Sequence, residues 1–327
     1  MTGPRAPRPR GPVSEAVLDA LRNPAGSGAV APAVAPDPWS DDVQLALYVC
    51  YELHYRGFAG VDSDWEWDPG LLSVRAGLEA AFLDALRAGV DSAPDAETAL
   101  APLLTEPDDG TGLSHHLLRD GDLDQFREYV VHRSVYHLKE ADPHALLIPR
   151  LTGRAKAAVV TVEFDEYGGG RAERMHSTLF ADLMTGLGLD AEYGHYLDRV
   201  PAPMLAVVNL MSLFGWHRSR RGMMVGHFAA AEAGTPPSAA RLAEALHRLG
   251  VTDPRCALFY TEHIEADAVH EQIMRREAVA PLLAEDPALE PDMVFGIEAT
   301  TLVEDRFADH LTSAWKSGGS SLLPSDR

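Results

Sequence analysis

Apolar residues recur at helical spacing in long segments that run from Asp41 almost to the C-terminus. Residues three and four positions apart lie on one face of a helix, so this spacing predicts amphipathic helices. Gly168–Gly170, Pro201, Pro236–Pro237 and Pro254 punctuate the pattern and separate one helix from the next. We expect helices over residues 41–57, 71–89, 122–141, 143–167, 171–189, 204–220, 223–234, 238–250, 257–284 and 293–318.

Strand signals are weak throughout the sequence. The best apolar run, residues 157–164, is flanked by helix-forming residues and has no hairpin turn on either side. We find no internal repeat. The pattern therefore predicts an all-α fold, with one helical domain over residues 39–327.

Residues 1–38 differ in composition from the rest, because they are rich in proline, glycine and alanine. This composition is typical of a flexible N-terminal arm, in which only residues 14–23 have the spacing of a short helix. The start of the chain is basic but lacks the apolar core of a signal peptide. We therefore expect an arm ahead of the helical domain and a cytoplasmic protein.

The charge and cysteine content narrow the choice of partner. A formal net charge of −21 argues against a nucleic acid or an anionic membrane surface. No run of about 18 apolar residues occurs, so we expect no membrane span. Cys50 and Cys256 form no Cys-x-x-Cys pair, which argues against a disulfide framework and a thiolate zinc site. A small molecule is the expected partner.

The clearest chemical signal lies near the C-terminus, where His263, Asp267 and His270 are spaced by four and three residues. In a helix these offsets place all three side chains on one face. Two histidines and one carboxylate can hold ferrous iron and leave coordination positions open for dioxygen. Taken alone, the same three residues are also compatible with a solvated polar stripe.

Two further clusters carry residues of the same chemical types. Glu166 precedes His176 by ten residues, and three consecutive glycines between them break a straight helix. The glycines are also compatible with an ordinary helix C-cap. Glu232 lies in a segment of small residues that allow neighbouring helices to approach closely. Two ferrous ions bring four positive charges and three carboxylates remove three, so such a buried site would be nearly neutral.

Together these residues resemble the pattern of the haem-oxygenase-like di-iron oxidase family, whose members are also called iron-containing redox enzymes. The resemblance covers about residues 130–280 and rests on Glu166-Tyr-Gly-Gly-Gly, His176, Glu232 and His263-x-x-x-Asp267-x-x-His270. It implies a haem-oxygenase-like helical bundle of about seven core helices. It also implies a homodimer and two Fe(II) ions per chain. The implied metal ligands, which are also the implied catalytic residues, are Glu166, His176, Glu232, His263, Asp267 and His270.

The resemblance implies a non-haem di-iron oxidase or oxygenase, with dioxygen as co-substrate. Such an enzyme oxidises a small organic substrate by C–H cleavage, desaturation or N-oxygenation. Two alternatives stay open. One is a metal-free enzyme of the same fold, of the thiaminase or quinone-cofactor-biosynthesis type, and the other is a non-catalytic metal-binding helical protein. Manganese in one position is also compatible with these ligands.

Other polar residues receive weaker assignments. Some members of the family carry a further upstream carboxylate, and Glu140 is the candidate here, although its match is poor. We expect Glu163 to be a surface acid and Glu262 to orient the imidazoles. A lone histidine on a helix is usually structural. We expect that of His54, His115, His116, His132, His137, His144, His195, His217, His227, His247 and His310.

Overall fold

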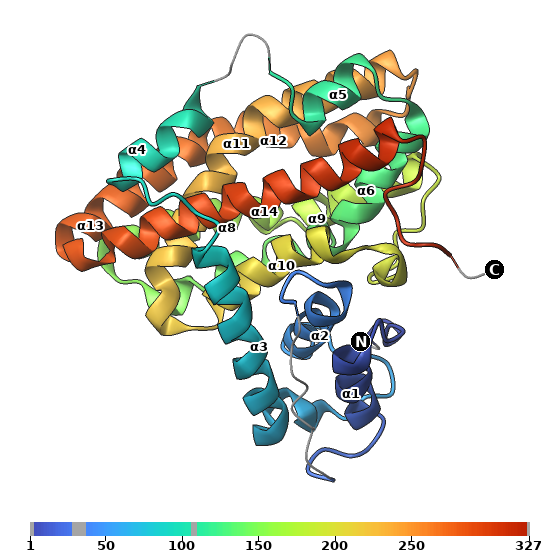
Figure 1. Ribbon diagram of the computed structural model, residues 1–327. Helices are drawn as coiled ribbons and strands as arrows, with labels where there is room; N and C mark the ends of the chain where they lie inside the picture. The colour runs from blue at the N-terminus through green and yellow to red at the C-terminus, as the bar shows by residue number, and fades with distance from the viewer. Residues whose placement is uncertain (1–2, 28–36, 106–109, 326–327) are drawn as a thin grey trace.

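The computed structural model describes residues 3–27, 37–105 and 110–325, and every regular element within these ranges is helical (Figure 1). The prediction of an all-α fold is confirmed. The α-helices are α1 (Pro12–Leu21), α2 (Asp41–Glu52), α3 (Pro69–Arg87), α4 (Ala96–Leu100), α5 (Leu113–Arg119), α6 (Leu123–His137), α7 (Asp142–Ala145), α8 (Gly153–Glu166), α9 (His176–Gly186), α10 (Ala202–Gly215), α11 (Arg221–Arg248), α12 (Pro254–Ile273), α13 (Ala280–Glu285) and α14 (Glu290–Lys316). A π-helical segment, Met274–Val279, joins α12 to α13.

The longest helices lie side by side and form the body of the bundle. α11 packs against both α12 and α14, and α10 packs against α14 (Figure 1). Gly226 of α11 allows a close approach, because a Cβ atom at this position would lie 2.1 Å from the carbonyl oxygen of Met293 in α14. The small residues of this segment therefore do bring a neighbouring helix close.

α10 runs through the interior, and its residues from Met204 to Gly215 are all buried. This burial explains why the segment has no polar face, since a helix that is apolar all round belongs in a core. α2 packs on one side of α10 and α14 on another. The helix expected over residues 204–220 is shorter in the structure, because α10 ends at Gly215 and a separate 3₁₀ turn, Arg218–Arg220, follows it.

The largest differences from the expected helices concern the continuity of two segments. The predicted break at Pro236–Pro237 is wrong, because α11 continues through both prolines from Arg221 to Arg248. A proline inside a helix removes a backbone hydrogen bond, but here packing on α12 and α14 holds the helix together. Conversely, the single helix expected over residues 143–167 is broken into α7, the 3₁₀ turn Ile148–Arg150 and α8.

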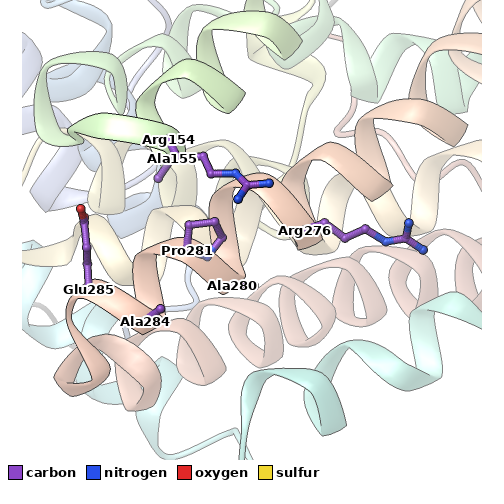
Figure 2. Close-up of a pocket in the computed structure, with 7 residues that line it drawn as sticks. All are labelled: Arg154, Ala155, Arg276, Ala280, Pro281, Ala284 and Glu285. Carbon is purple, nitrogen blue, oxygen red and sulfur yellow. The ribbon is translucent and has the colours of Figure 1, made fainter.

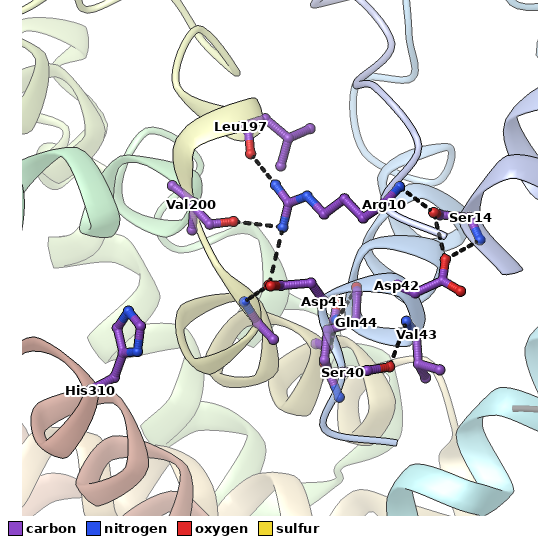
Figure 3. Close-up of polar contacts among 12 residues, drawn as sticks. Arg10, Ser14, Ser40, Asp41, Asp42, Val43, Gln44, Leu197, Val200 and His310 are labelled. Carbon is purple, nitrogen blue, oxygen red and sulfur yellow. Dashed lines mark hydrogen bonds and ion pairs between the residues drawn. The ribbon is translucent and has the colours of Figure 1, made fainter. Parts of the chain in front are cut away.

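Part of the N-terminal segment, for which the composition predicts a flexible arm over residues 1–38, packs against the bundle. Helix α1 buries Val13 and Val17 against α2. The guanidinium of Arg10 donates hydrogen bonds to the carbonyl oxygens of Leu197 and Val200, at 2.7 and 2.8 Å (Figure 3). Arginine's several donors explain how one basic residue of the segment anchors it. Residues 1–2 and 28–36 lie outside the described residues.

A buried ion pair joins the N-terminal helices to the rest of the bundle. Lys139 Nζ donates to Glu52 Oε2 at 2.9 Å, and both side chains are at most 1% exposed. The Lys139 ammonium also lies over the rings of Tyr48 and Tyr55, 4.8 and 4.3 Å from their centroids. Tyr193 Oη donates to both oxygens of Glu52. The pair is therefore fully satisfied inside the protein.

Candidate metal centre

All six predicted ligands lie on helices that face the bundle interior, and all are buried. α8 ends at Glu166 and α9 begins at His176, while α11 contributes Glu232. α12 presents His263, Asp267 and His270 from one face, in agreement with their spacing. The alternative that these three residues form a solvent-exposed polar stripe is therefore wrong.

A glycine turn brings Glu166 and His176 together. Gly168 has a φ of +69°, which L-residues rarely adopt, and a Cβ atom there would lie 2.6 Å from the backbone nitrogen of Met175. Only glycine fits this close chain reversal. The result is that His176 Nδ1 lies 2.7 Å from Glu166 Oε2.

The buried acids and imidazoles form two adjacent groups that share Glu166. The first group contains Glu140, Glu166, His176 and His263, and the second contains Glu166, Asp267 and His270. Within each group, one candidate ligand atom per residue lies within 4.8 Å of the others.

Glu166 faces both groups, and Glu232 adjoins the second. Glu166 Oε2 lies near His176, while Glu166 Oε1 lies 3.6 Å from His270 Nδ1. Glu232 Oε2 is 3.4 Å from the same His270 nitrogen. One carboxylate with an oxygen toward each group has the geometry of a bridging ligand.

Two imidazoles are held so that one nitrogen faces the carboxylates. His263 Nδ1 donates to the carbonyl oxygen of Phe259 at 2.6 Å, because that oxygen can only accept. His270 Nε2 lies 3.1 Å from Asp165 Oδ2 and donates to it. In their neutral forms, His263 and His270 would therefore carry the lone pair on the inward nitrogen, Nε2 and Nδ1 respectively, as metal-binding histidines do. Nothing in the sequence pattern indicates this role of Asp165.

The inward-facing atoms also lack hydrogen-bond partners among the described residues. They are Glu140 Oε2, His176 Nδ1, Glu232 Oε2, Asp267 Oδ1 and His270 Nδ1. Buried polar atoms are normally hydrogen-bonded, so a cluster of unpartnered acceptors calls for a cation. Carboxylate oxygens and imidazole nitrogens are suitable ligands for divalent iron or manganese. The residues present therefore fit a two-metal site.

Crowding of the acids shifts their protonation. Burial, followed by repulsion from Glu140 and Asp267, raises the pKa of Glu166 well above its usual value. Burial and Asp267 raise the pKa of Glu232 to about 8. These carboxyls cannot all be ionised side by side, whereas divalent cations between them would remove the repulsion.

Three secondary assignments need correction. Glu140, judged a poor match, belongs to the first group, and its Oε2 lies 3.9 Å from His263 Nε2. Glu163 is only 2% exposed rather than a surface acid, and burial together with Glu166 raises its pKa to about 9. Glu262 pairs with Arg174 and not with an imidazole. Each error arises from tertiary packing that helical spacing does not encode.

The histidines expected to be structural include three that approach the site. His137 Nδ1 lies 3.0 Å from Glu140 Oε2. His144 Nε2 contacts His227 Nε2 at 3.1 Å, and His227 Nδ1 contacts Thr300 Oγ1 at 2.8 Å. All three line the cavity described next, but none belongs to either group of candidate ligands.

A cavity of about 370 Å³ opens beside the two groups. Its wall includes Glu140, Glu166, Glu232, His263 and Asp267, so bound substrate would meet the acids directly. α11, which carries Glu232, also contributes small and apolar side chains to the lining, such as Ala230 and Ala231. An apolar pocket with a few convergent polar groups is the usual form of a small-molecule site.

A second hollow of about 430 Å³ lies between α8 and α13, away from these residues (Figure 2). Arg154, Arg276 and Glu285 line it together with alanines and a proline. Arg154 is paired with Glu277, and none of the candidate ligands reaches this hollow. We assign the chemistry to the cavity beside the acids.

Comparison with known proteins agrees with this geometry. Residues 127–305 match a family described as "Iron-containing redox enzyme". The chain belongs to this family. It is also 28% identical over 173 residues to nitrosourea synthase from Streptomyces achromogenes subsp. streptozoticus, an alignment that covers 53% of this chain. The chain spans only 36% of that relative's length.

The family assignment confirms the resemblance inferred from the sequence and supports an oxidative enzyme. The matched range contains every candidate ligand, from Glu140 to His270. Among the described residues, no helix has the length and apolar character needed to cross a membrane.

We expect the stability of this iron-containing redox enzyme, once stripped of metal, to fall as pH rises from about 7 to about 9. Glu163 and Glu232 have raised pKa values, about 9 and about 8, so the folded state binds more protons than the unfolded state in this window. The pKa of His270 is raised to about 11: burial lowers it, but Asp267 and Glu232 outweigh burial. The stabilisation that protonated His270 contributes is complete below pH 6.5 and is lost as the pH rises toward about 11. All three raised pKa values therefore lower the stability of the folded state as the pH rises.

Thermal unfolding with a chelator, compared with unfolding in excess Mn²⁺, measures this effect. Metal binding needs ionised carboxylates, so the stabilisation by Mn²⁺ should grow with pH. Glu163→Gln should flatten the slope of the chelated protein, because it removes a titrating group without changing its shape. A melting temperature of the chelated protein that rises over this pH range would contradict the expectation.

Proposed function

We propose that this protein is a non-haem di-iron oxidase or oxygenase that uses dioxygen to oxidise a small organic substrate. The reaction would be C–H cleavage, desaturation or N-oxygenation. The observation that most strongly supports this proposal is that Glu166 is shared by two buried groups of acids and imidazoles beside a cavity. Membership of the iron-containing redox enzyme family and similarity to a nitrosourea synthase support the proposal.

Each ion has its own set of ligands in this proposal. Glu140, His176 and His263 would hold one ion, Glu232, Asp267 and His270 would hold the other, and Glu166 would serve both. This set adds Glu140 to the six residues inferred from the sequence. Its four carboxylates balance the four positive charges of two ferrous ions, which lowers the free energy of burying them. Bound there, the two ions would supply electrons and open coordination positions for dioxygen.

The remaining residues prepare the site. The carbonyl oxygen of Phe259 and the carboxylate of Asp165 each accept a hydrogen bond from the outer nitrogen of His263 and His270, so that the inner nitrogen is the one that would bind a metal ion after losing its proton. Glu163, whose pKa is raised to about 9, holds a proton near neutral pH one helical turn from Glu166.

Anaerobic titration with ferrous iron, followed by exposure to oxygen, tests the proposal. We expect two ferrous ions per chain, and rapid oxygen consumption accompanied by a transient visible absorption. Binding of iron without oxygen consumption would favour the non-catalytic metal-binding protein. Absence of iron binding would favour the metal-free enzyme. Elemental analysis of the protein purified from its host distinguishes two irons from one iron and one manganese.

A further inference from the structure

The cavity continues from the acids along α6 toward the surface. Tyr129, Arg133 and His137 of α6 all line it, and their spacing of four residues places them on one face of the helix. Arg133 lies one turn, about 6 Å of helix rise, before His137. His137 Nδ1 in turn lies 3.0 Å from Glu140. A ligand held at Arg133 would therefore have its other end beside the candidate metal centre.

Arg133 forms a two-point ion pair with Glu304 of α14 inside this cavity. Its Nη1 and Nη2 donate to Glu304 Oε1 and Oε2 at 2.9 and 2.7 Å. Burial would raise the pKa of Glu304, but Arg133 outweighs burial and lowers it, so the pair stays ionised. The Glu304 side chain nevertheless remains 36% exposed and lines the cavity.

The pair keeps unused hydrogen-bonding capacity. A guanidinium has five N–H donors and a carboxylate has about four acceptor positions, of which the pair uses two each. Arg133 could therefore bind a ligand carboxylate while Glu304 accepts from a ligand ammonium. The Arg133 guanidinium also packs over the Phe307 ring at 4.8 Å, which fixes its orientation.

A third polar group reaches the same part of the cavity. Tyr260 of α12 is 4% exposed and lines the cavity, and its hydroxyl has no hydrogen-bond partner among the described residues. The ring of Phe126 contacts the rings of both Tyr129 and Tyr260. The Arg133 guanidinium lies over the same Tyr129 ring, which places Tyr260 near this end of the cavity. Because buried hydroxyls normally have a partner, this one is available to a ligand.

The charge balance distinguishes between classes of ligand. Arg133 and Glu304 neutralise each other, so a ligand with a single charge would bury an uncompensated charge. A fatty acid brings a carboxylate but no cation for Glu304, whereas a zwitterion matches both members of the pair. Asp305, at the exposed edge of the cavity, adds a negative charge that attracts an ammonium group. The volume of about 370 Å³ is at the small end for ligand sites.

We infer that Arg133, Glu304 and Tyr260 bind the α-ammonium and α-carboxylate groups of an amino-acid substrate. The inference rests on the proposed function, because the bound amino acid is taken to be the molecule oxidised. The side chain of the amino acid then extends along α6 toward Glu140 and Glu166. Oxidation accordingly occurs on the side chain and leaves the α-carbon untouched.

Matched probes test the zwitterion requirement. Isothermal titration of the full-length protein loaded with Mn²⁺, which prevents turnover, compares L-norleucine with hexanoate and pentylamine. These analogues keep the carbon chain but lack the ammonium or the carboxylate. L-Lysine, 6-aminohexanoate and cadaverine form a second matched set. We expect at least one amino acid to bind about tenfold more tightly than both of its analogues. Equal affinity within both sets, or no binding of either amino acid at about 10 mM, would overturn the inference.

Variants locate the binding to the proposed residues. Arg133→Gln/Glu304→Gln removes both charges together, so that no buried charge is left unpaired, and should abolish the preference for the amino acid. Tyr260→Phe should weaken binding of the amino acid by severalfold. Arg127→Gln, an arginine of the same helix that does not line the cavity, serves as the control. An unchanged preference in the double variant would overturn the inference.

Iron content, measured in the same samples, separates this inference from the proposed function. Two ferrous ions without selective amino-acid binding would leave the oxidase proposal and remove the substrate assignment. Selective amino-acid binding without iron binding would leave the assignment of the amino-acid site and remove the oxidase proposal. The double variant should keep its full iron content, because neither residue belongs to the candidate ligand groups.

Discussion

Replacing Glu166 with alanine is expected to reduce the iron content from two ions per chain to nearly none. The reason is that Glu166 belongs to both ligand groups, with one oxygen near His176 and the other near His270. Loss of this carboxylate weakens both sites, and the three remaining carboxylates leave one of the four positive charges of two ferrous ions unbalanced. Anaerobic ferrous titration followed by elemental analysis measures the effect.

Single-site variants provide the comparison. Glu140→Ala and Asp267→Ala each lie in one group only and should leave about one ion per chain. Glu262→Ala, on the same helix as Asp267 but paired with Arg174, should keep both. Circular dichroism should show native helix content in every variant. Retention of an ion at full affinity in the Glu166 variant would contradict a shared carboxylate.

Replacing Lys139 with methionine should destabilise the whole protein by about 3–5 kcal/mol. The substitution leaves the carboxylate of Glu52 buried without a cation, although Tyr193 still donates to it. A matched double variant, Lys139→Met/Glu52→Gln, leaves no unpaired charge and should recover much of the loss. Urea unfolding of the metal-free protein gives both free energies of unfolding.

An exposed pair serves as the control for the buried one. Arg22 and Asp19 form an ion pair on α1 whose side chains are 70% and 55% exposed. Solvent screens such a pair, so Arg22→Met should change stability very little. If Lys139→Met were as mild as this control, the buried pair would not hold the two parts of the molecule together.

The sequence predicted those parts of the site that are local in the chain. The spacing of His263, Asp267 and His270 determines their common face, and the glycines after Glu166 predict the turn that leads to His176. Both depend on backbone rules that operate within about ten residues. The all-α class follows in the same way from apolar periodicity.

The errors concern contacts between distant segments. Asp165 orients His270 from 105 positions away, and Glu163 is buried because α8 packs against neighbouring helices. The N-terminal residues look like an arm by composition, yet Arg10 binds carbonyl groups 187 and 190 positions further along. The continuity of α11 was also not predictable from local sequence, because interhelical packing outweighs the free-energy cost of two internal prolines.

The buried link between Glu52 and Lys139 also determines where the chain can be cut. Residues 127–305 match the family, but Lys139 lies inside this range and depends on an acid outside it. The next residue, Glu140, belongs to a ligand group. A shortened protein that starts at residue 127 would therefore leave the Lys139 ammonium without its buried partner, one residue from the candidate metal centre. The helices that precede residue 127 should accordingly be retained in any minimal version of the protein.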